Sequence, residues 1–143
     1  MVNKDKLLQR VAAVEPNVNM RKLGKYLTTD QFTMGDPLWV DSLAMIPSGD
    51  RGKFDLILIG YVLQEIPSAK GRQLVIDALW QRLNDNGVMV VIEPGSPKGF
   101  RYIHSFREWV IAKSREEANI VAPCPHMREC PLARDAQSWC HFS

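Results

Sequence analysis

The sequence lacks several features that would place a protein in a common class at once. No apolar run reaches the roughly 18 residues of a membrane-spanning helix, and there is no low-complexity tract or internal repeat. The first 123 residues contain no cysteine, which argues against a disulfide framework spread along the chain. No Gly-x-Gly-x-x-Gly string or phosphate loop occurs either. We therefore expect no membrane span, no solenoid and no self-contained dinucleotide site.

Charge and composition are ordinary for a soluble globular domain. The chain has 143 residues, of which 45% are hydrophobic, and 18 Lys and Arg stand against 16 Asp and Glu, for a net charge of +2. This length fits one domain and leaves little room for two. The charge balance neither demands nor excludes a nucleic-acid partner, because binding depends on where the positive charge is clustered.

The first third of the chain alternates between helix and strand patterns. Residues 4–9 are expected to end a helix, and residues 10–14 form a short strand that stops at Glu15-Pro16. Asn17 is a suitable N-cap for a helix over residues 18–27, and residues 38–43 form a second brief strand. These patterns indicate an α/β domain.

The central part gives the clearest pattern. Residues 54–60 are an almost continuous apolar run, as expected of a parallel strand buried on both faces. A helix through Leu83, stopped by Asn86-Gly87, and a buried strand over residues 88–92 complete a β-α-β unit. A long helix over about residues 99–117 follows. The chain thus predicts a domain over residues 1–118 and an irregular tail over residues 119–143.

Polar side chains follow three of the predicted strands. Ligands of open α/β sheets bind at the carboxyl ends of the strands, where Glu15, Tyr61 and Glu93 are found. An acid such as Glu15 can accept hydrogen bonds from two ribose hydroxyls, although a solvated acid beside a turn is the alternative. Glu93 can take part in acid–base chemistry or simply cap a turn.

The tail contains every cysteine of the chain. Cys124, Cys130 and Cys140 are an odd, clustered set, and two of them are followed by proline, as also occurs at iron–sulfur ligands. Their gaps differ from common zinc-finger spacings. The alternatives are an iron–sulfur cluster with a fourth ligand from elsewhere, a zinc site completed by His126 or His141, and three unrelated thiols.

Taken together, these residues resemble the methyltransferase-like family associated with the mitochondrial small ribosomal subunit. The resemblance extends from about Arg10 to Ser143. Its specificity comes from two of the strings given next, the one from Glu93 to Phe100 and the cysteine-bearing tail. The strings are Val14-Glu15-Pro16-Asn17, Tyr61-Val62-Leu63-Gln64-Glu65-Ile66-Pro67, Glu93-Pro94-Gly95-Ser96-Pro97-Lys98-Gly99-Phe100, and the tail with Cys-Pro-His, Cys-Pro and Trp-Cys-His-Phe-Ser.

The resemblance implies a Rossmann-like class I methyltransferase fold in a mitochondrial protein. It also implies contacts with small-subunit ribosomal RNA and proteins. S-adenosylmethionine is its possible cofactor, with Glu15 at the ribose, Asp41 near the adenine and Tyr61 at a neighbouring strand end. The family's four-iron cluster has four cysteine ligands, and Cys124, Cys130 and Cys140 match three of them.

Three family features are not found in this sequence. The family's first strand and Gly-rich loop precede the Glu15 strand, and a fourth cysteine follows the tail. We therefore expect an incomplete sheet with open strand edges, completed by a second chain that supplies these parts. The function expected is a component or assembly factor of the mitochondrial small ribosomal subunit, not catalytic as this chain alone. The alternatives are a ribosomal RNA methyltransferase and a zinc-binding module.

Overall fold

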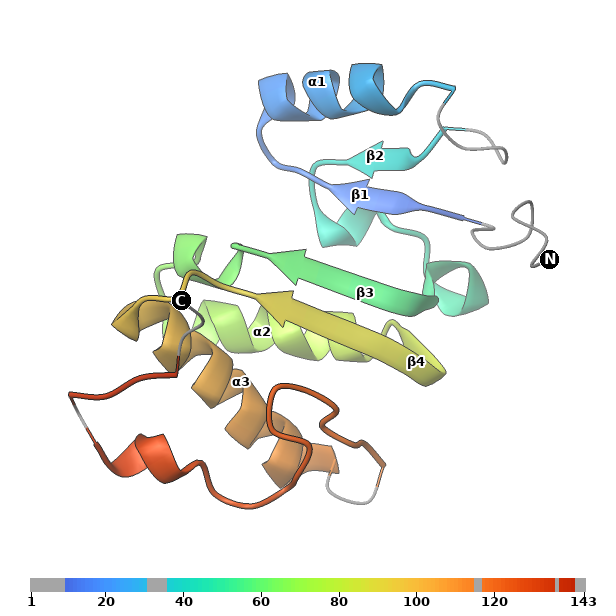
Figure 1. The fold of residues 1–143 in the computed structure, drawn as a ribbon. Coiled ribbons are helices and arrows are strands. Elements are labelled where there is room, and N and C mark those ends of the chain that lie inside the picture. Colours follow the sequence, from blue (N-terminus) through green and yellow to red (C-terminus); the bar gives the residue numbers. More distant parts are fainter. Residues whose placement is uncertain (1–9, 31–35, 115–116, 136, 141–143) are drawn as a thin grey trace, which may run out of the picture. The chain divides into compact units, whose positions relative to one another are not determined.

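The chain divides into two compact units, residues 1–53 and 54–143. The computed structural model describes residues 10–30, 36–114, 117–135 and 137–140. Figure 1 shows the course of the chain through helices and strands. The helix expected over residues 4–9 lies outside the described residues.

The first unit is a small β-α-β arrangement. Strand β1 (Ala12–Val14) pairs in parallel with β2 (Leu38–Val40), and helix α1 (Val18–Thr28) connects them in the sequence. The Asn17 side chain accepts hydrogen bonds from the backbone N–H groups of Asn19 and Met20, which confirms the predicted N-cap.

The packing of α1 on β2 depends on one glycine. A Cβ at Gly24 would overlap the ring of Trp39, so only glycine lets the indole lie against this helix. The Trp39 indole N–H donates to Thr28 Oγ1 at 3.3 Å. The half-buried indole thus has a hydrogen-bond partner, as is usual for tryptophan.

Strand β2 is shorter than the predicted range of residues 38–43. It ends at Val40, and after a bend the backbone forms two 3-10 turns, η2 (Leu43–Met45) and η3 (Gly49–Gly52). The Ile46 N–H donates to the carbonyl of Leu43 at 3.2 Å. This local hydrogen bond turns the chain away from the sheet ladder, which the apolar sequence alone does not reveal.

The second unit contains a longer parallel pair. Strand β3 (Phe54–Gly60) is followed by the turn η4 (Leu63–Glu65), helix α2 (Ala69–Trp80) and strand β4 (Leu83–Ile92). The two strands pair in parallel, with Ile57 opposite Met89 and Ile59 opposite Val91. The predicted β-α-β unit is therefore confirmed.

Helix α2 ends earlier than the sequence predicted. It stops at Trp80, whereas Leu83 already pairs with Phe54 in the sheet. The carbonyl of Arg82 accepts the Phe54 N–H at 2.8 Å, so the ladder begins directly after the helix. Asn86 has φ of 62°, a left-handed conformation that asparagine tolerates, and it falls where the register shifts. Asn86-Gly87 thus forms an irregularity in β4 and not a helix stop.

Helix α3 and the tail complete the second unit. Helix α3 runs from Pro97 to Ser114, two residues earlier at its start than predicted, and the tail contains one 3-10 turn, η5 (Pro131–Arg134). Lys113 forms an ion pair with Asp77 of α2. The rings of Trp80 and Trp109 meet edge to face with centroids 5.2 Å apart. These contacts hold α3 beside α2.

Only one face of the β3–β4 sheet is buried, which corrects the prediction of burial on both. Ile57 and Ile59 are 8% and 3% exposed, but Leu56 and Leu58 are 58% and 65% exposed. The reason is the placement of the helices, because α2 and α3 lie on the same side of this sheet (Figure 1). Val88 and Ile92 extend the exposed apolar face on β4.

The strands form two separate sheets. Within the described residues, β1 pairs with β2 and β3 pairs with β4, both in parallel. The predicted α/β class is confirmed, and two short parallel sheets are compatible with an incomplete Rossmann-like sheet. Among the described residues, each strand of these two-stranded sheets has one edge without a partner strand.

The start of α3 supplies the first testable prediction. Gly99 is buried, and a Cβ there would overlap the carbonyl of Pro94, a backbone atom that cannot move aside alone. We expect Gly99→Ala to lower the free energy of unfolding by about 1–3 kcal/mol, the usual cost of overpacking. Gly60→Ala is the control, since a Cβ there meets nothing within 4 Å. Equal thermal melting temperatures for the two variants would contradict this prediction.

Candidate functional site

Two of the predicted cofactor residues lie at the same end of one sheet. Glu15 follows Val14 at the end of β1, and Asp41 follows Val40 at the end of β2, and these two strand residues are register partners. Glu15 is half-buried, and its Oε1 accepts the backbone N–H of Asn17 at 2.7 Å. Asp41 is exposed. The structure therefore brings two carboxylates to the expected edge, one of them oriented by the first turn of α1.

Tyr61 occupies the corresponding position in the second unit. It follows β3 directly, is 53% exposed and has φ of 58°. Its backbone N–H donates to the carbonyl of Ile92 at 2.8 Å, so the ladder fixes this turn. A left-handed conformation is uncommon for an aromatic residue and often occurs at functional turns.

Glu93 at the end of β4 acts as a cap. Its Oε1 accepts the backbone N–H of the buried Leu63 at 2.8 Å, which fixes the turn η4. Its Oε2 is buried and has no hydrogen-bond partner among the described residues. The capping interpretation of Glu93 is thus the one that the contacts support.

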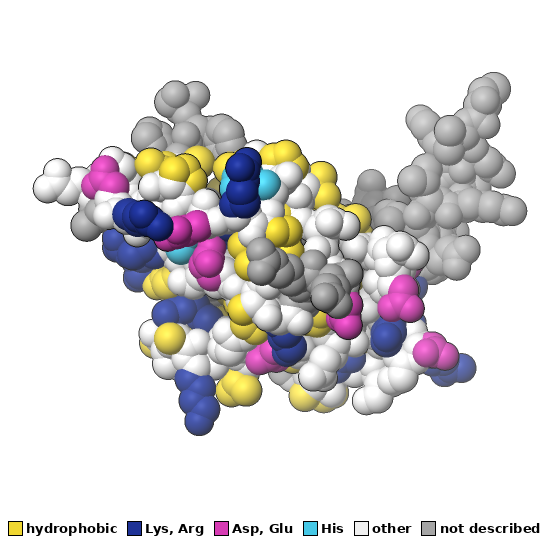
Figure 2. Space-filling model, turned by 90° about the horizontal axis from the view of Figure 1, so that it is seen from below, with side chains coloured by type: hydrophobic (Ala, Val, Ile, Leu, Met, Phe, Trp, Pro, Cys, Tyr) yellow, Lys and Arg dark blue, Asp and Glu magenta, His cyan; other side chains and the backbone are white. Residues whose placement is uncertain are grey.

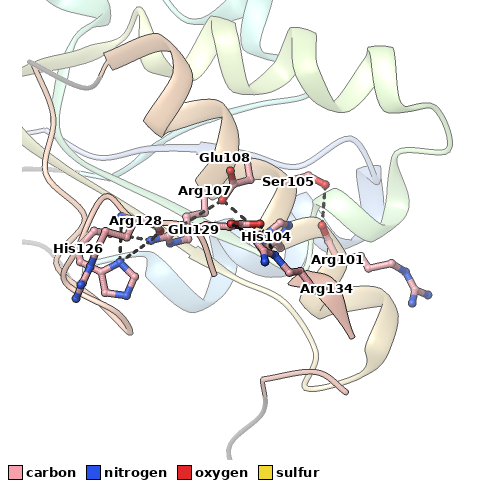
Figure 3. A network of polar contacts seen from close by, with 9 residues as sticks. All are labelled: Arg101, His104, Ser105, Arg107, Glu108, His126, Arg128, Glu129 and Arg134. Carbon is pink, nitrogen blue, oxygen red and sulfur yellow. Dashed lines mark hydrogen bonds and ion pairs between the residues drawn. The ribbon is translucent and has the colours of Figure 1, made fainter. Parts of the chain in front are cut away.

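The tail is attached to α3 by one arginine. The guanidinium of Arg107 donates to the carbonyl oxygens of His126 and Arg128, each at 2.7 Å, and lies 3.2 Å from His126 Nδ1. Its side chain is only 11% exposed and also contacts Glu108. Figure 3 shows these side chains converging on the turn between His126 and Arg128. The nearly buried Arg107 therefore orients the backbone of the cysteine-bearing segment.

Further contacts fix the rest of the tail. Arg134 pairs with Glu129 across η5, and this hydrogen bond lowers the pKa of the Glu129 carboxyl below its ordinary value. Ser138 donates to Asp135, which lowers the pKa of that carboxyl in the same way. The Trp139 indole N–H donates to the carbonyl of Gly95 at 3.1 Å, which ties the tail to the family string before α3.

The three cysteines are free thiols. Cys124 and Cys130 are partly buried and Cys140 is exposed. Within the described residues, no three of the side chains His, Cys, Asp and Glu are gathered closely enough to hold a metal ion. The donor set suits a cluster or zinc, but this arrangement of the tail does not assemble it. The ligand assignment of Cys124, Cys130 and Cys140 stays a prediction.

The histidines named for zinc differ in their surroundings. His126 Nδ1 accepts the backbone N–H of Arg128 at 3.1 Å and lies beside Arg107, so this nitrogen is occupied. His141 lies outside the described residues. His126 thus serves to shape the turn that Arg107 binds.

Sequence reasoning missed Arg107. Its signal was an arginine beside Phe106 and Trp109, on the largely apolar stretch of α3. A cation placed among aromatic residues of a packed helix has to find acceptors elsewhere in the fold. That pattern predicts a buried arginine, but not which backbone carbonyls it binds.

No helix within the described part of the chain is long and apolar enough to cross a membrane.

The comparisons with known proteins agree with the resemblance seen in the sequence. The family model "Mitochondrial small ribosomal subunit Rsm22" matches residues 5–143. The Rsm22-cox11 tandem proteins 1 and 2, mitochondrial, of Schizosaccharomyces pombe are each 30% identical over 131 residues, covering 85% of this chain and 17% of the relative. The human "Ribosome assembly protein METTL17, mitochondrial" is 28% identical over 105 residues, covering 68% of this chain and 22% of the relative.

The chain therefore spans about a fifth of the length of these relatives. All three are named mitochondrial, which confirms the predicted localisation. Because the family model covers nearly every residue, the chain belongs to the Rsm22 family of the mitochondrial small ribosomal subunit.

Proposed function

We propose that this chain is a component or assembly factor of the mitochondrial small ribosomal subunit. The observation that carries the proposal is the family match over residues 5–143, together with a relative named as a ribosome assembly protein. Fold likeness alone does not give a function. Here the specific tail and the Glu93-to-Phe100 string lie within the matched residues.

The test is depletion of the protein in its native cells, followed by sedimentation of mitochondrial ribosomes. We expect free small subunits and small-subunit RNA to decrease while large subunits remain. Re-expression of the unaltered sequence restores the profile. Unchanged small subunits after depletion would contradict the assembly role.

We propose further that Cys124, Cys130 and Cys140 are three ligands of a four-iron cluster, with the fourth thiolate from outside this sequence. Free thiols in a proline-rich tail support this assignment, as does the family membership. A bound cluster would cross-link an irregular segment that has few apolar residues to order it. Zinc is the alternative metal. Cys124 and Cys130 flank, in sequence, the turn whose carbonyls Arg107 binds.

A second polypeptide is proposed to complete the sheet. The open strand edges of both two-stranded sheets and the exposed Leu56, Leu58, Val88 and Ile92 support this proposal. Exposed apolar side chains that lie together on one face of a sheet are typical of surfaces that another element covers.

The exposed sheet face leads to a prediction for the isolated chain. We expect it to bind a hydrophobic dye or to aggregate, and the double variant Leu56→Ser with Leu58→Ser to bind less dye. Melting temperature should stay close to that of the unaltered chain, since both side chains are more than half exposed. The Ile59→Ser variant is the contrast, because Ile59 is buried and its loss should unfold the unit. A soluble, dye-free monomer that unfolds cooperatively would contradict the proposal.

The second candidate function is an S-adenosylmethionine-dependent methyltransferase acting on ribosomal RNA. It is favoured by one observation, the convergence of Glu15 and Asp41 at the carboxyl ends of β1 and β2. Without the backbone amides of a Gly-rich loop, we expect the isolated chain to bind the cofactor poorly. Binding then depends on a Gly-rich loop from outside this sequence.

The cofactor prediction concerns Glu15 within the native complex. If S-adenosylmethionine binds there, Glu15→Ala should weaken binding by about 1–3 kcal/mol, the cost of losing a hydrogen bond to a charged group. Isothermal titration calorimetry measures this change, with Glu65→Ala as a control on an exposed acid. Micromolar binding to the isolated chain would show that the missing loop is unimportant.

A further inference from the structure

A groove between α2 and α3 is not used by any of the sites above. Its volume is about 350 Å³. It lies on the helical side of the β3–β4 sheet. Figure 2 shows Lys and Arg, Asp and Glu, and hydrophobic side chains intermixed on the face seen from below. The residues that carry the inference are Arg72, Gln73, Arg101, Tyr102, Ser105 and Phe106, which all line the groove.

The charge of this groove is of one sign. None of its lining residues is acidic, and two are arginines. The first turns of α2 and α3 contain no acidic residue, while Lys70 and Lys98 lie in these turns. Cations near helix N-termini are unfavourable with respect to the helix dipole. Arg72 and Arg101 line the groove, and Lys98 lies beside Tyr102. A surface with these cations and no acidic lining residue favours a negatively charged partner.

The arginines are held differently. Arg72 donates to the carbonyls of Ile66 and Pro67 at 2.6 and 3.3 Å, and its guanidinium carbon lies 4.5 Å from the centroid of the Tyr102 ring. Arg101 is exposed and forms no ion pair within the described residues. In Figure 3 its guanidinium points away from the Arg107 network. Arg72 is thus fixed in the wall, while Arg101 is free to meet a partner at the rim.

Aromatic and hydrogen-bonding groups complete the lining. Tyr102 and Phe106 are partly exposed. The Gln73 amide donates to Asp77 and the Ser105 hydroxyl donates to the carbonyl of Arg101, so their oxygens are left as acceptors. Lys98 Nζ lies 5.8 Å from the Tyr102 ring centroid. Cations for phosphates and aromatic rings for bases are the combination with which proteins hold single-stranded nucleic acid.

We propose that this groove binds an unpaired segment of RNA, with Lys98 and Arg101 at phosphates and Tyr102 and Phe106 beside a base. The inference rests on the proposed function for the source of that RNA. The proposal assigns the RNA contact to the helical face of the second unit, opposite the exposed face of the β3–β4 sheet.

The test is ultraviolet cross-linking of the full-length protein in its native cells, followed by mass spectrometry of tryptic peptides. Trypsin cleaves after Arg101 and Arg107, so one peptide, residues 102–107, contains both aromatic residues of the groove. We expect nucleotide adducts on this peptide. The double variant Lys98→Gln with Arg101→Gln should reduce total RNA adducts at least fivefold, whereas Arg51→Gln, at an exposed arginine of the first unit, should not.

Three outcomes would overturn the inference. One is RNA adducts on other peptides but none from the groove. Another is an equal loss of adducts in the Arg51→Gln control, which would indicate net charge alone. The third is capture of an acidic protein at Lys70 or Lys98 in place of RNA.

Co-sedimentation with small subunits, measured in the same cells, separates this inference from the proposed function. A chain that co-sediments without groove adducts refutes the groove only, whereas one that does not co-sediment refutes the assembly role.

Discussion

Replacement of Arg107 by alanine is expected to release the tail from α3. The guanidinium is nearly buried and donates to the carbonyls of His126 and Arg128. Hydrogen bonds from a charged group are worth about 1.5–3 kcal/mol each and are not additive, so we expect the tail to lose about 2–4 kcal/mol of local stability. Hydrogen exchange on the native complex should become about 30- to 1,000-fold faster over residues 121–134.

Two further variants serve as comparisons for Arg107→Ala. In Arg107, Nη2 donates to both carbonyls while Nη1 donates to Glu108. Arg107→Lys retains the charge but lacks this second nitrogen and the planar geometry, so it should rescue little. Arg134→Ala removes an arginine from the same tail, but Arg134 and Glu129 are 79% and 58% exposed. Exposed ion pairs contribute little, so exchange should barely change. If Arg134→Ala loosened the tail as much as Arg107→Ala, the anchoring role of Arg107 would be refuted.

Replacement of Cys130 by serine is expected to abolish binding of the proposed cluster, measured as the iron content of the native complex. Cys130 directly precedes η5 and is partly buried, and a four-iron cluster needs four thiolates. Because metal ligation supplies folding energy to such segments, residues 121–143 should lose protection from proteases. The unit from Phe54 to Glu93 should remain folded, since its core does not include the tail.

The rival metal is tested by His126. His126→Gln should leave the iron content unchanged, because the proposed cluster uses only thiolates. The same variant should remove zinc if His126 completes a zinc site. Elemental analysis and visible absorption of material prepared without oxygen give the answer. Zinc with no iron would refute the cluster.

The elements that the sequence predicted correctly are those set by local chemistry. Asn17 caps α1 through its own side chain, and the apolar run from Phe54 to Gly60 forms a strand. The end of α2 was mispredicted because Leu83 pairs with Phe54 in the sheet and does not continue the helix. This contact joins residues that are distant in sequence. Burial of β3 on one face also depends on where α2 and α3 lie, which periodicity does not encode.

The candidate sites were predictable to a similar extent. Strand ends placed Glu15 and Asp41 at one edge, because carboxyl ends of parallel strands meet. Arg107 was missed because its acceptors are 19 and 21 residues away and belong to the backbone. Because every residue has a backbone carbonyl, the sequence does not show which carbonyls an arginine binds. Such a contact is found only from the fold. The gathering of the cysteines stays a prediction, because the described part of the tail does not bring three metal-binding side chains together.

The measurement that tests the central claim most directly is purification of the chain from native mitochondria under conditions that preserve ribosomal subunits. Co-purifying proteins and RNA are identified, and iron and zinc are counted per molecule. The account predicts small-subunit proteins, small-subunit RNA, a partner that completes the sheet, and iron. A chain that purifies alone, or with proteins unrelated to the small subunit, would contradict the account.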